Sequence, residues 1–218
     1  MLSWMPATGV ERSLWIIIIV LAAGYLAGQW LNRQRSKRIA AWLQAGLGAL
    51  GGRVAWKWLR SMNAGAEVTV QEARPPYRGL VIVYYLLTRE FAPLWLFEWL
   101  RGKRDLMSLR ADLRTQPGRE FDIVPSKGKL RQELDTAAGQ QTYQWQELTG
   151  GLGLATLGQP GRASIHRVEQ FLNTYGPYVE RISLRRRAPH VIAFFRLSGM
   201  ENMKSEELWR ALGDLVQG

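Results

Sequence analysis

The chain has no cysteine and only two histidines among its 218 residues. The absence of cysteine excludes disulfide bonds, thiolate metal sites, iron–sulfur clusters and cysteine nucleophiles. The two histidines, His166 and His190, begin a predicted helix and a predicted strand, where a surface or turn role is more common than metal ligation. No HExxH, GxSxG or protein-kinase motif is present, and no nucleophile–base pair stands out. We therefore expect a protein that is not an enzyme and holds no metal or cofactor.

Acidic residues are also scarce. The chain has 18 Asp and Glu against 29 Lys and Arg, which gives a formal net charge of +11. A surface with this balance attracts polyanions such as nucleic acid, anionic lipid headgroups or an acidic protein. Tryptophan, by contrast, is abundant, with ten residues. Its side chain favours places with one apolar and one wet side, such as the surface of a membrane.

Residues 14–31 carry no charge. Eighteen helical residues span about 27 Å, close to the apolar thickness of a bilayer. Trp15 and Trp30 stand at the two ends of the run, where interfacial aromatic residues are usual. Gly24 and Gly28 have the GxxxG spacing that permits close helix–helix approach, which adds the prediction of a homodimer through this segment. We expect a single transmembrane helix over residues 13–31.

Four basic residues follow the apolar run, namely Arg33, Arg35, Lys37 and Arg38. The positive-inside rule then places residues 1–12 outside and the bulk of the chain in the cytoplasm. The membrane would be the cell membrane, or that of the endoplasmic reticulum in a eukaryote. The alternative is a signal peptide cleaved near Ala22-Ala23-Gly24, but a basic cluster after the apolar run opposes translocation, so we favour a retained anchor.

The rest of the pattern predicts an α+β fold, with a mostly antiparallel sheet and helices packed on one side of it. We expect a basic juxtamembrane helix within residues 32–52 and a cytosolic α+β domain over 53–218. Expected strands cover residues 53–60, 67–74, 80–87, 105–113, 120–124, 143–148, 179–185 and 191–197. Expected helices cover residues 91–100, 127–134, 164–175 and 205–216, the last with Ser205 as its N-cap. The glycine-rich residues 150–161 are expected to form a loop or hinge.

The segment 91–100, with sequence FAPLWLFEWL, allows two interpretations. Burial of its apolar face in the core is the favoured one. In the other, Trp95 and Trp99 contact lipid headgroups or a transmembrane helix of a partner.

The basic residues beyond the anchor gather in further clusters. All the cationic residues that we expect to bind an anionic partner are Arg33, Arg35, Lys37, Arg38, Arg101, Lys103, Arg104, Lys127, Lys129, Arg131, Arg185, Arg186 and Arg187. Anionic lipid explains the cluster beside the anchor. A ribosomal RNA surface would use all of them through phosphate contacts. No RRM, KH or zinc-knuckle signature appears, so base-specific RNA recognition is not expected.

The sequence FLNTY at Phe171–Tyr175, followed by VERISL at Val179–Leu184, resembles the helix-to-strand stretch of the calumin family. These are coiled-coil-containing endoplasmic reticulum proteins of the PAT complex, an intramembrane chaperone for multipass proteins. The order of anchor, basic helix, strands and final helix is also similar. The resemblance implies a cytosolic α+β domain on one anchor that acts without catalysis at the ribosome–translocon interface. The family's acidic luminal region and long coiled-coil tail have no counterpart in these 218 residues.

Two functions follow as hypotheses. The first is a single-pass membrane protein that assists membrane-protein insertion or folding, with anionic lipid, a ribosome and a translocon or insertase as partners. The second is a lipid- or solute-binding accessory subunit of a membrane complex, suggested by the tryptophan content and by the glycine-rich segment.

Overall fold

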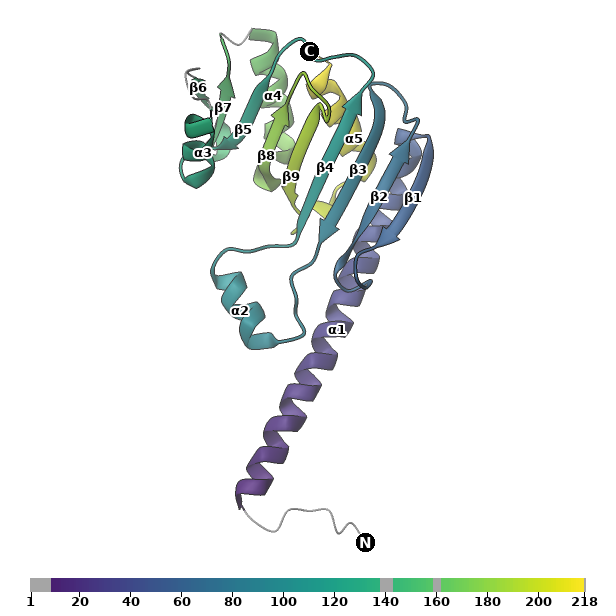
Figure 1. Ribbon diagram of the computed structural model, residues 1–218, viewed down its shortest axis with the longest axis vertical. Helices are drawn as coiled ribbons and strands as arrows, with labels where there is room; N and C mark the ends of the chain where they lie inside the picture. The colour runs from purple at the N-terminus through teal and green to yellow at the C-terminus, as the bar shows by residue number, and fades with distance from the viewer. Residues whose placement is uncertain (1–8, 138–142, 159–161, 218) are drawn as a thin grey trace.

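A single long helix organises the molecule (Figure 1). The computed structural model describes residues 9–137, 143–158 and 162–217. Helix α1, Gly9–Leu50, has 42 residues and runs without interruption from the apolar segment into the folded domain. No proline interrupts these residues, so nothing in the sequence breaks the backbone hydrogen bonds of the helix. Residues 1–8 of the expected outer segment 1–12 and residues 159–161 of the expected hinge 150–161 lie outside the described residues.

Nine strands form one sheet in which every neighbouring pair is antiparallel. Their order across the sheet is β1-β2-β3-β4-β9-β8-β5-β7-β6. The strands are β1 Arg53–Trp58, β2 Gly65–Gln71, β3 Tyr77–Tyr85, β4 Leu106–Leu113, β5 Phe121–Pro125, β6 Gln144–Glu147, β7 Leu152–Thr156, β8 Val179–Leu184 and β9 Val191–Arg196. The first four strands form a meander, and the β8–β9 hairpin inserts between β4 and β5. The predicted α+β fold with a mostly antiparallel sheet is confirmed.

The other α-helices of the described residues are α2 Ala92–Leu100, α3 Lys129–Ala137, α4 Arg162–Tyr175 and α5 Ser205–Val216. Figure 1 shows α4, α5 and the C-terminal half of α1 behind the sheet, all on one face. Helix α2 stands apart below the sheet, beside α1, because it belongs to a long excursion between β3 and β4.

The core lies between that sheet face and the three helices. Alternate residues of β3, such as Leu80 and Ile82, point into it and are buried, as strand periodicity requires. Ile39 and Leu43 from α1 are completely buried in the same core. The predicted boundary between a juxtamembrane helix at 32–52 and a separate domain from 53 is therefore wrong, because residues 39–50 form part of the domain's core.

The glycine-rich segment is a strand rather than a hinge. Residues Leu152–Thr156 form β7, which is buried along its whole length between β5 and β6. Gly153 lies under Trp145 of β6, and a Cβ at Gly153 would sit 3.3 Å from that indole ring. Gly153 leaves room for the Trp145 side chain and does not mark a loop. The prediction of a loop from the glycine content was therefore wrong at this position.

Helices α1 and α5 are joined by reciprocal hydrogen bonds. The Ser205 hydroxyl donates to the Trp42 carbonyl oxygen at 2.5 Å, and the Trp42 indole N–H donates to the Met203 carbonyl oxygen at 2.7 Å. Ser205 therefore does not cap α5 as predicted, because its hydroxyl is turned toward α1 and α5 has no side-chain cap. These bonds fix α5 against the part of α1 that lies in the core.

Two glycines of α1 should respond in opposite directions to substitution by alanine. A Cβ at Gly46 would lie 2.4 Å from the Ser205 hydroxyl oxygen, whereas a Cβ at Gly48 would meet nothing within 4 Å. We expect Gly48→Ala to raise the free energy of unfolding by about 0.5–1 kcal/mol through helix propensity. Gly46→Ala should lower it by about 1–3 kcal/mol because the close contact outweighs that gain. Thermal unfolding in detergent, followed by circular dichroism, measures both, and two shifts of the same sign would contradict the packing of α1 on α5.

Candidate membrane and polyanion interfaces

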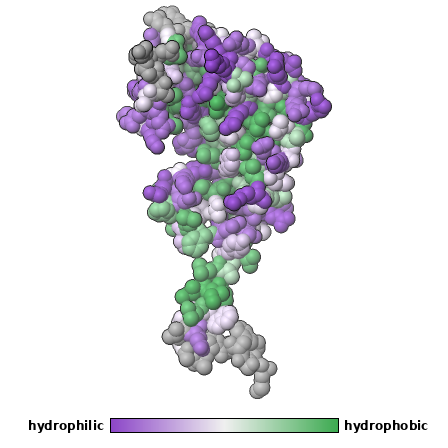
Figure 2. Space-filling model, in the orientation of Figure 1, coloured by the Kyte–Doolittle hydropathy of each residue, from purple (hydrophilic) through white to green (hydrophobic). Residues whose placement is uncertain are grey.

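The N-terminal half of α1 is apolar and exposed. Figure 2 shows it as a hydrophobic stem below the rest of the molecule. Among the described residues, α1 is the one helix long and apolar enough to cross a membrane. Its large side chains there, such as Ile16 and Leu26, are more than half exposed. An exposed apolar surface of this length suits a bilayer rather than water.

Helix α2 buries none of its residues, so the favoured expectation of core burial for 91–100 is wrong. Phe97 and Leu100 expose 53% and 68% of their surface, and Leu94 and Leu96 are similarly open. The physical reason is the length of the segment between β3 and β4, which carries α2 beyond the ends of these strands and out of reach of the core. An exposed helix this apolar matches the second interpretation, contact with lipid or with a partner's helix.

Gly28 brings the α2 excursion against α1. A Cβ at this position would lie 2.0 Å from the carbonyl oxygen of Arg89, which precedes α2. The small residue is therefore needed for an approach within the chain. The homodimer predicted from the Gly24 and Gly28 spacing stays a prediction, but the Gly28 surface already contacts the protein's own backbone. Gly24 is different, because a Cβ there meets nothing within 4 Å.

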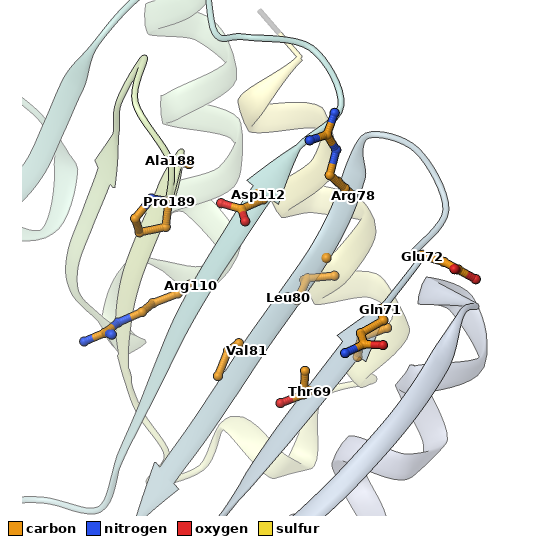
Figure 3. Close-up of a pocket in the computed structure, with 12 residues that line it drawn as sticks. Thr69, Gln71, Glu72, Arg78, Leu80, Val81, Arg110, Asp112, Ala188 and Pro189 are labelled. Carbon is orange, nitrogen blue, oxygen red and sulfur yellow. The ribbon is translucent and has the colours of Figure 1, made fainter.

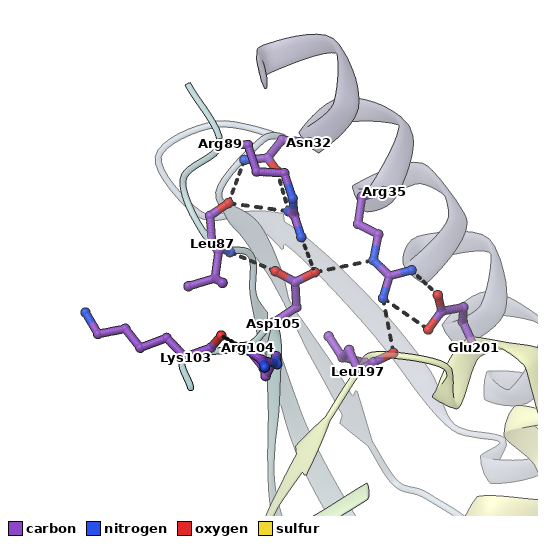
Figure 4. Close-up of polar contacts among 9 residues, drawn as sticks. All are labelled: Asn32, Arg35, Leu87, Arg89, Lys103, Arg104, Asp105, Leu197 and Glu201. Atoms are coloured by element: carbon purple, nitrogen blue, oxygen red, sulfur yellow. Dashed lines mark hydrogen bonds and ion pairs between the residues drawn. The ribbon is translucent and has the colours of Figure 1, made fainter. Parts of the chain in front are cut away.

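A buried carboxylate fixes the excursion to α1 (Figure 4). The Asp105 side chain is only 4% exposed and accepts hydrogen bonds from Arg89 at 2.9 Å and from Arg35 at 3.3 Å. Its second oxygen accepts the Leu87 backbone N–H at 2.9 Å. A buried carboxylate is stable only with such partners, so Asp105 joins α1 to both ends of the α2 excursion.

The same network extends to Asn32 and Glu201. Asn32 accepts from Arg89 at 2.6 Å and donates to the Leu87 carbonyl oxygen at 2.9 Å. Arg35 also forms an ion pair with Glu201, in the turn before α5. The structure thus places Arg35 in an internal network, whereas Arg33, Lys37 and Arg38 are exposed. Sequence reasoning missed Arg89, Asp105 and Glu201, because ion pairs over 70 and 166 residues leave no local pattern.

A cavity of about 560 Å³ lies between α1 and α2. The α1 residues that line it are small or apolar at one end and polar or basic at the other. The lining comprises Gly24, Ala27, Gly28, Leu31, Gln34, Arg35, Arg38, Leu87, Arg89, Ala92, Trp95, Trp99, Arg104, Asp105 and Ser198. Seven of the residues predicted to contact a membrane or an anion thus meet in one place: Gly24, Gly28, Trp95, Trp99, Arg35, Arg38 and Arg104.

The Arg185–Arg187 cluster lies at the other end of the sheet. It forms the β8–β9 turn, and the following His190 accepts the Leu113 backbone N–H at the end of β4. The C-terminal end of α1 is close by, because the Leu50 carbonyl accepts the Arg74 N–H at 2.7 Å. We call this end of the molecule the distal end. Its exposed arginines are Arg53, Arg74, Arg78, Arg114, Arg119, Arg185, Arg186 and Arg187.

The Lys127–Arg131 cluster is separate from the distal end. Lys127 follows β5, and Lys129 and Arg131 belong to the first turn of α3, at the opposite end of β5 from the residues that pair with β8. Arg131 donates to the Ser126 carbonyl oxygen at 2.8 Å and lies 4.5 Å from the centre of the Trp145 ring. Lys129 lies 3.6 Å from Glu133. The basic clusters predicted to share one partner therefore face different parts of the surroundings.

The sheet face opposite α1, α4 and α5 carries a second recess near the distal end (Figure 3). It has a volume of about 620 Å³ and crosses β2, β3 and β4. Arg78 and Arg110 line it, both exposed and with no ion pair within the described chain. Between them Asp112 keeps one buried carboxylate oxygen without a hydrogen-bond partner. The recess therefore places two arginines beside two carboxylates, because Glu72 lines it together with Asp112.

The described residues contain no group of three or more histidines and carboxylates placed to hold a metal. His166 is exposed, and His190 links two strands. Burial raises the pKa of Tyr84, whose hydroxyl meets that of Ser36 at 2.9 Å, so this tyrosine stays neutral and joins β3 to α1.

Comparison with known proteins gives no family. No protein-family model matches the chain, and no curated protein matches it. The resemblance to the calumin family therefore stays a prediction.

Removing the Asp105 carboxylate should release α2. We expect Asp105→Ala to cost about 3 kcal/mol, because Arg35 and Arg89 then lose their shared buried partner. Limited digestion with trypsin should cut sooner after Arg101, Lys103 and Arg104, which lie in the released segment. The control is Glu72→Ala, which removes an exposed ion pair with Arg53 that is worth about 0–1 kcal/mol. Equal digestion of both variants would show that Asp105 does not hold the excursion.

Proposed function

We propose that this chain is a non-enzymatic, single-pass membrane protein that assists the insertion or folding of other membrane proteins. Its N-terminus lies outside, its bulk lies in the cytoplasm, and its partners are a ribosome and a translocon or insertase. The observation that carries the proposal is the set of exposed arginines at the distal end, on the opposite side of the domain from the membrane-facing helices.

Lipid cannot be the partner of these arginines. The apolar run of α1 ends at Leu31, and the helix continues to Leu50, which lies at the distal end. Nineteen helical residues correspond to about 28 Å along the axis. At physiological ionic strength the Debye length is about 8 Å, so the surface charge of the bilayer is screened before it reaches this height. The partner must therefore be another anionic body in the cytoplasm.

Phosphate-rich RNA on a ribosome fits that partner. Arginine binds phosphate through two parallel N–H donors, and it keeps its charge at every physiological pH. The distal end gathers eight exposed arginines, of which Arg53 is paired with Glu72. Contacts of this kind hold a backbone without reading bases, in agreement with the lack of an RNA-recognition motif. The calumin-like sequence at 171–184 supports the same function.

The membrane end would receive the client. Helix α2 and the residue before it expose Phe91, Leu94, Leu96, Phe97 and Leu100 to the surroundings. Such a surface can shield the apolar side of a transmembrane helix that has not yet packed. One molecule would thus contact the ribosome at one end and the emerging protein at the other.

The second hypothesis, a lipid- or solute-binding accessory subunit, has a different basis in the structure. Part of the glycine-rich segment that suggested it, Leu152–Thr156, forms the buried strand β7 rather than a loop or hinge. The cavity between α1 and α2 supports it instead.

Salt-dependent cosedimentation with ribosomes tests the proposal. The full-length protein would be placed in nanodiscs of neutral lipid, so that only the protein supplies the attraction. We expect pelleting at low salt that weakens as salt rises. R185E/R186E/R187E should weaken it and reduce the slope of log K against log salt by about 2, since about three phosphate contacts are lost at roughly 0.7 each.

The matched control is K57E/K127E/K129E, which changes the net charge equally at exposed lysines away from the distal end. Absence of pelleting at low salt would contradict the proposal. So would an equal loss in both variants, because the effect would then come from net charge rather than from the distal end.

A further inference from the structure

We propose that the cavity between α1 and α2 is a binding site for one anionic phospholipid. Its phosphate would lie between Arg38 and Arg104, and one acyl chain would run along α1 past Gly24. This site lies at the other end of the molecule from the distal arginines and does not depend on their partner.

The cavity is apolar at one end and basic at the other, in the same order as the acyl chain and the phosphate of a phospholipid. Along α1 the lining passes from Gly24 through Leu31 to Arg38. The first two belong to the apolar run and the last lies about two helical turns beyond it. The apolar end of the cavity would therefore lie within the bilayer and the basic end at its surface, where the acyl chains and the phosphate of a lipid reside.

The charges around the cavity do not cancel. Arg35 and Arg89 are compensated by Asp105 and Glu201. Arg38, in contrast, is exposed and has no carboxylate within ion-pair distance in the described ranges 9–137, 143–158 and 162–217.

Arg104 likewise has no acidic partner in these ranges. Its guanidinium donates only to the carbonyl oxygens of Trp99 and Lys103, at 2.8 and 2.7 Å. The two unpaired cations, one from α1 and one from the end of the α2 excursion, are complementary to an anionic headgroup.

The tryptophans of α2 complete the site. Ala92, Trp95 and Trp99 recur at helical spacing and turn the same side of α2 toward the cavity. The Arg104 guanidinium lies 5.2 Å from the centre of the Trp99 ring, which supports it against the aromatic face. The Trp95 indole N–H is buried and has no acceptor among the described residues. A phosphate or ester oxygen in the cavity would supply one.

The room for the acyl chain comes from small residues. A Cβ at Gly24 would meet nothing within 4 Å, although Gly24 lines the cavity. Ala27 and Gly28 continue this small-residue side until the Arg89 backbone closes it. The surrounding network through Asp105 holds α2 at a fixed distance from α1, so the cavity exists before a lipid enters.

Native mass spectrometry of the full-length protein tests the site. The protein would be purified in a neutral detergent and titrated with phosphatidylglycerol or phosphatidylcholine. We expect one phosphatidylglycerol to bind preferentially. R38Q/R104Q should weaken it about 30-fold, since each cation near a headgroup is worth about a factor of five. The control K57Q/R60Q removes the same charge at exposed positions that do not line the cavity, and it should bind as the parent does.

A steric variant tests the acyl chain. Gly24→Leu should block binding, and Gly48→Leu, at an equally open site in the core half of α1, should not. Excess inorganic phosphate should fail to displace the lipid. Equal loss in R38Q/R104Q and K57Q/R60Q would overturn the proposal, as would full binding by Gly24→Leu, displacement by phosphate, or equal affinity for phosphatidylcholine. Ribosome cosedimentation should be unchanged in R38Q/R104Q, so failure of one proposal is distinguishable from failure of the other.

Discussion

The buried carboxylate of Asp105 is the contact on which the membrane side of the molecule depends. Two arginines share it, one from α1 and one from the segment before α2, and a backbone N–H occupies its other oxygen. A nine-residue helix with no buried residue has no packing energy of its own to fix its position. The carboxylate, together with the close approach at Gly28, supplies that position and creates the cavity beside α1.

This arrangement separates the positive charges of the chain into groups with different surroundings. Arg35 and Arg89 form ion pairs that hold the structure together, Arg38 and Arg104 line the cavity between α1 and α2, and the Arg185 cluster lies at the distal end. Composition alone gives one net charge and suggests one kind of partner. The fold divides that charge between internal ion pairs, the cavity proposed for a lipid and the distal end, and each group can be tested by its own variants.

Strands and helices with regular apolar spacing were predictable because their periodicity is local. The eight expected strands appear, as do helices within 32–52 and at 205–216. Strand β7 was not predicted because its segment is rich in glycine, although Gly153 lies in a buried strand beneath Trp145. Helix α2 was found as a helix, but its exposure could not be read from FAPLWLFEWL, because burial depends on where the excursion leads. The candidate site shows the same limit: Trp95, Arg38 and Arg104 were recognised singly, while the Asp105 network that assembles them spans distant segments.

The continuity of α1 has a mechanical consequence. The same 42-residue helix is apolar enough to cross a bilayer at one end and lies in the domain's core at the other, with no proline between them. Any change in the tilt of α1 is therefore transmitted to the whole domain. An arm of about 28 Å that inclines by about 20° carries its far end sideways by about 10 Å. The thickness of a bilayer affects the tilt of a transmembrane helix. It would thus change the lateral position of the distal-end arginines relative to the membrane.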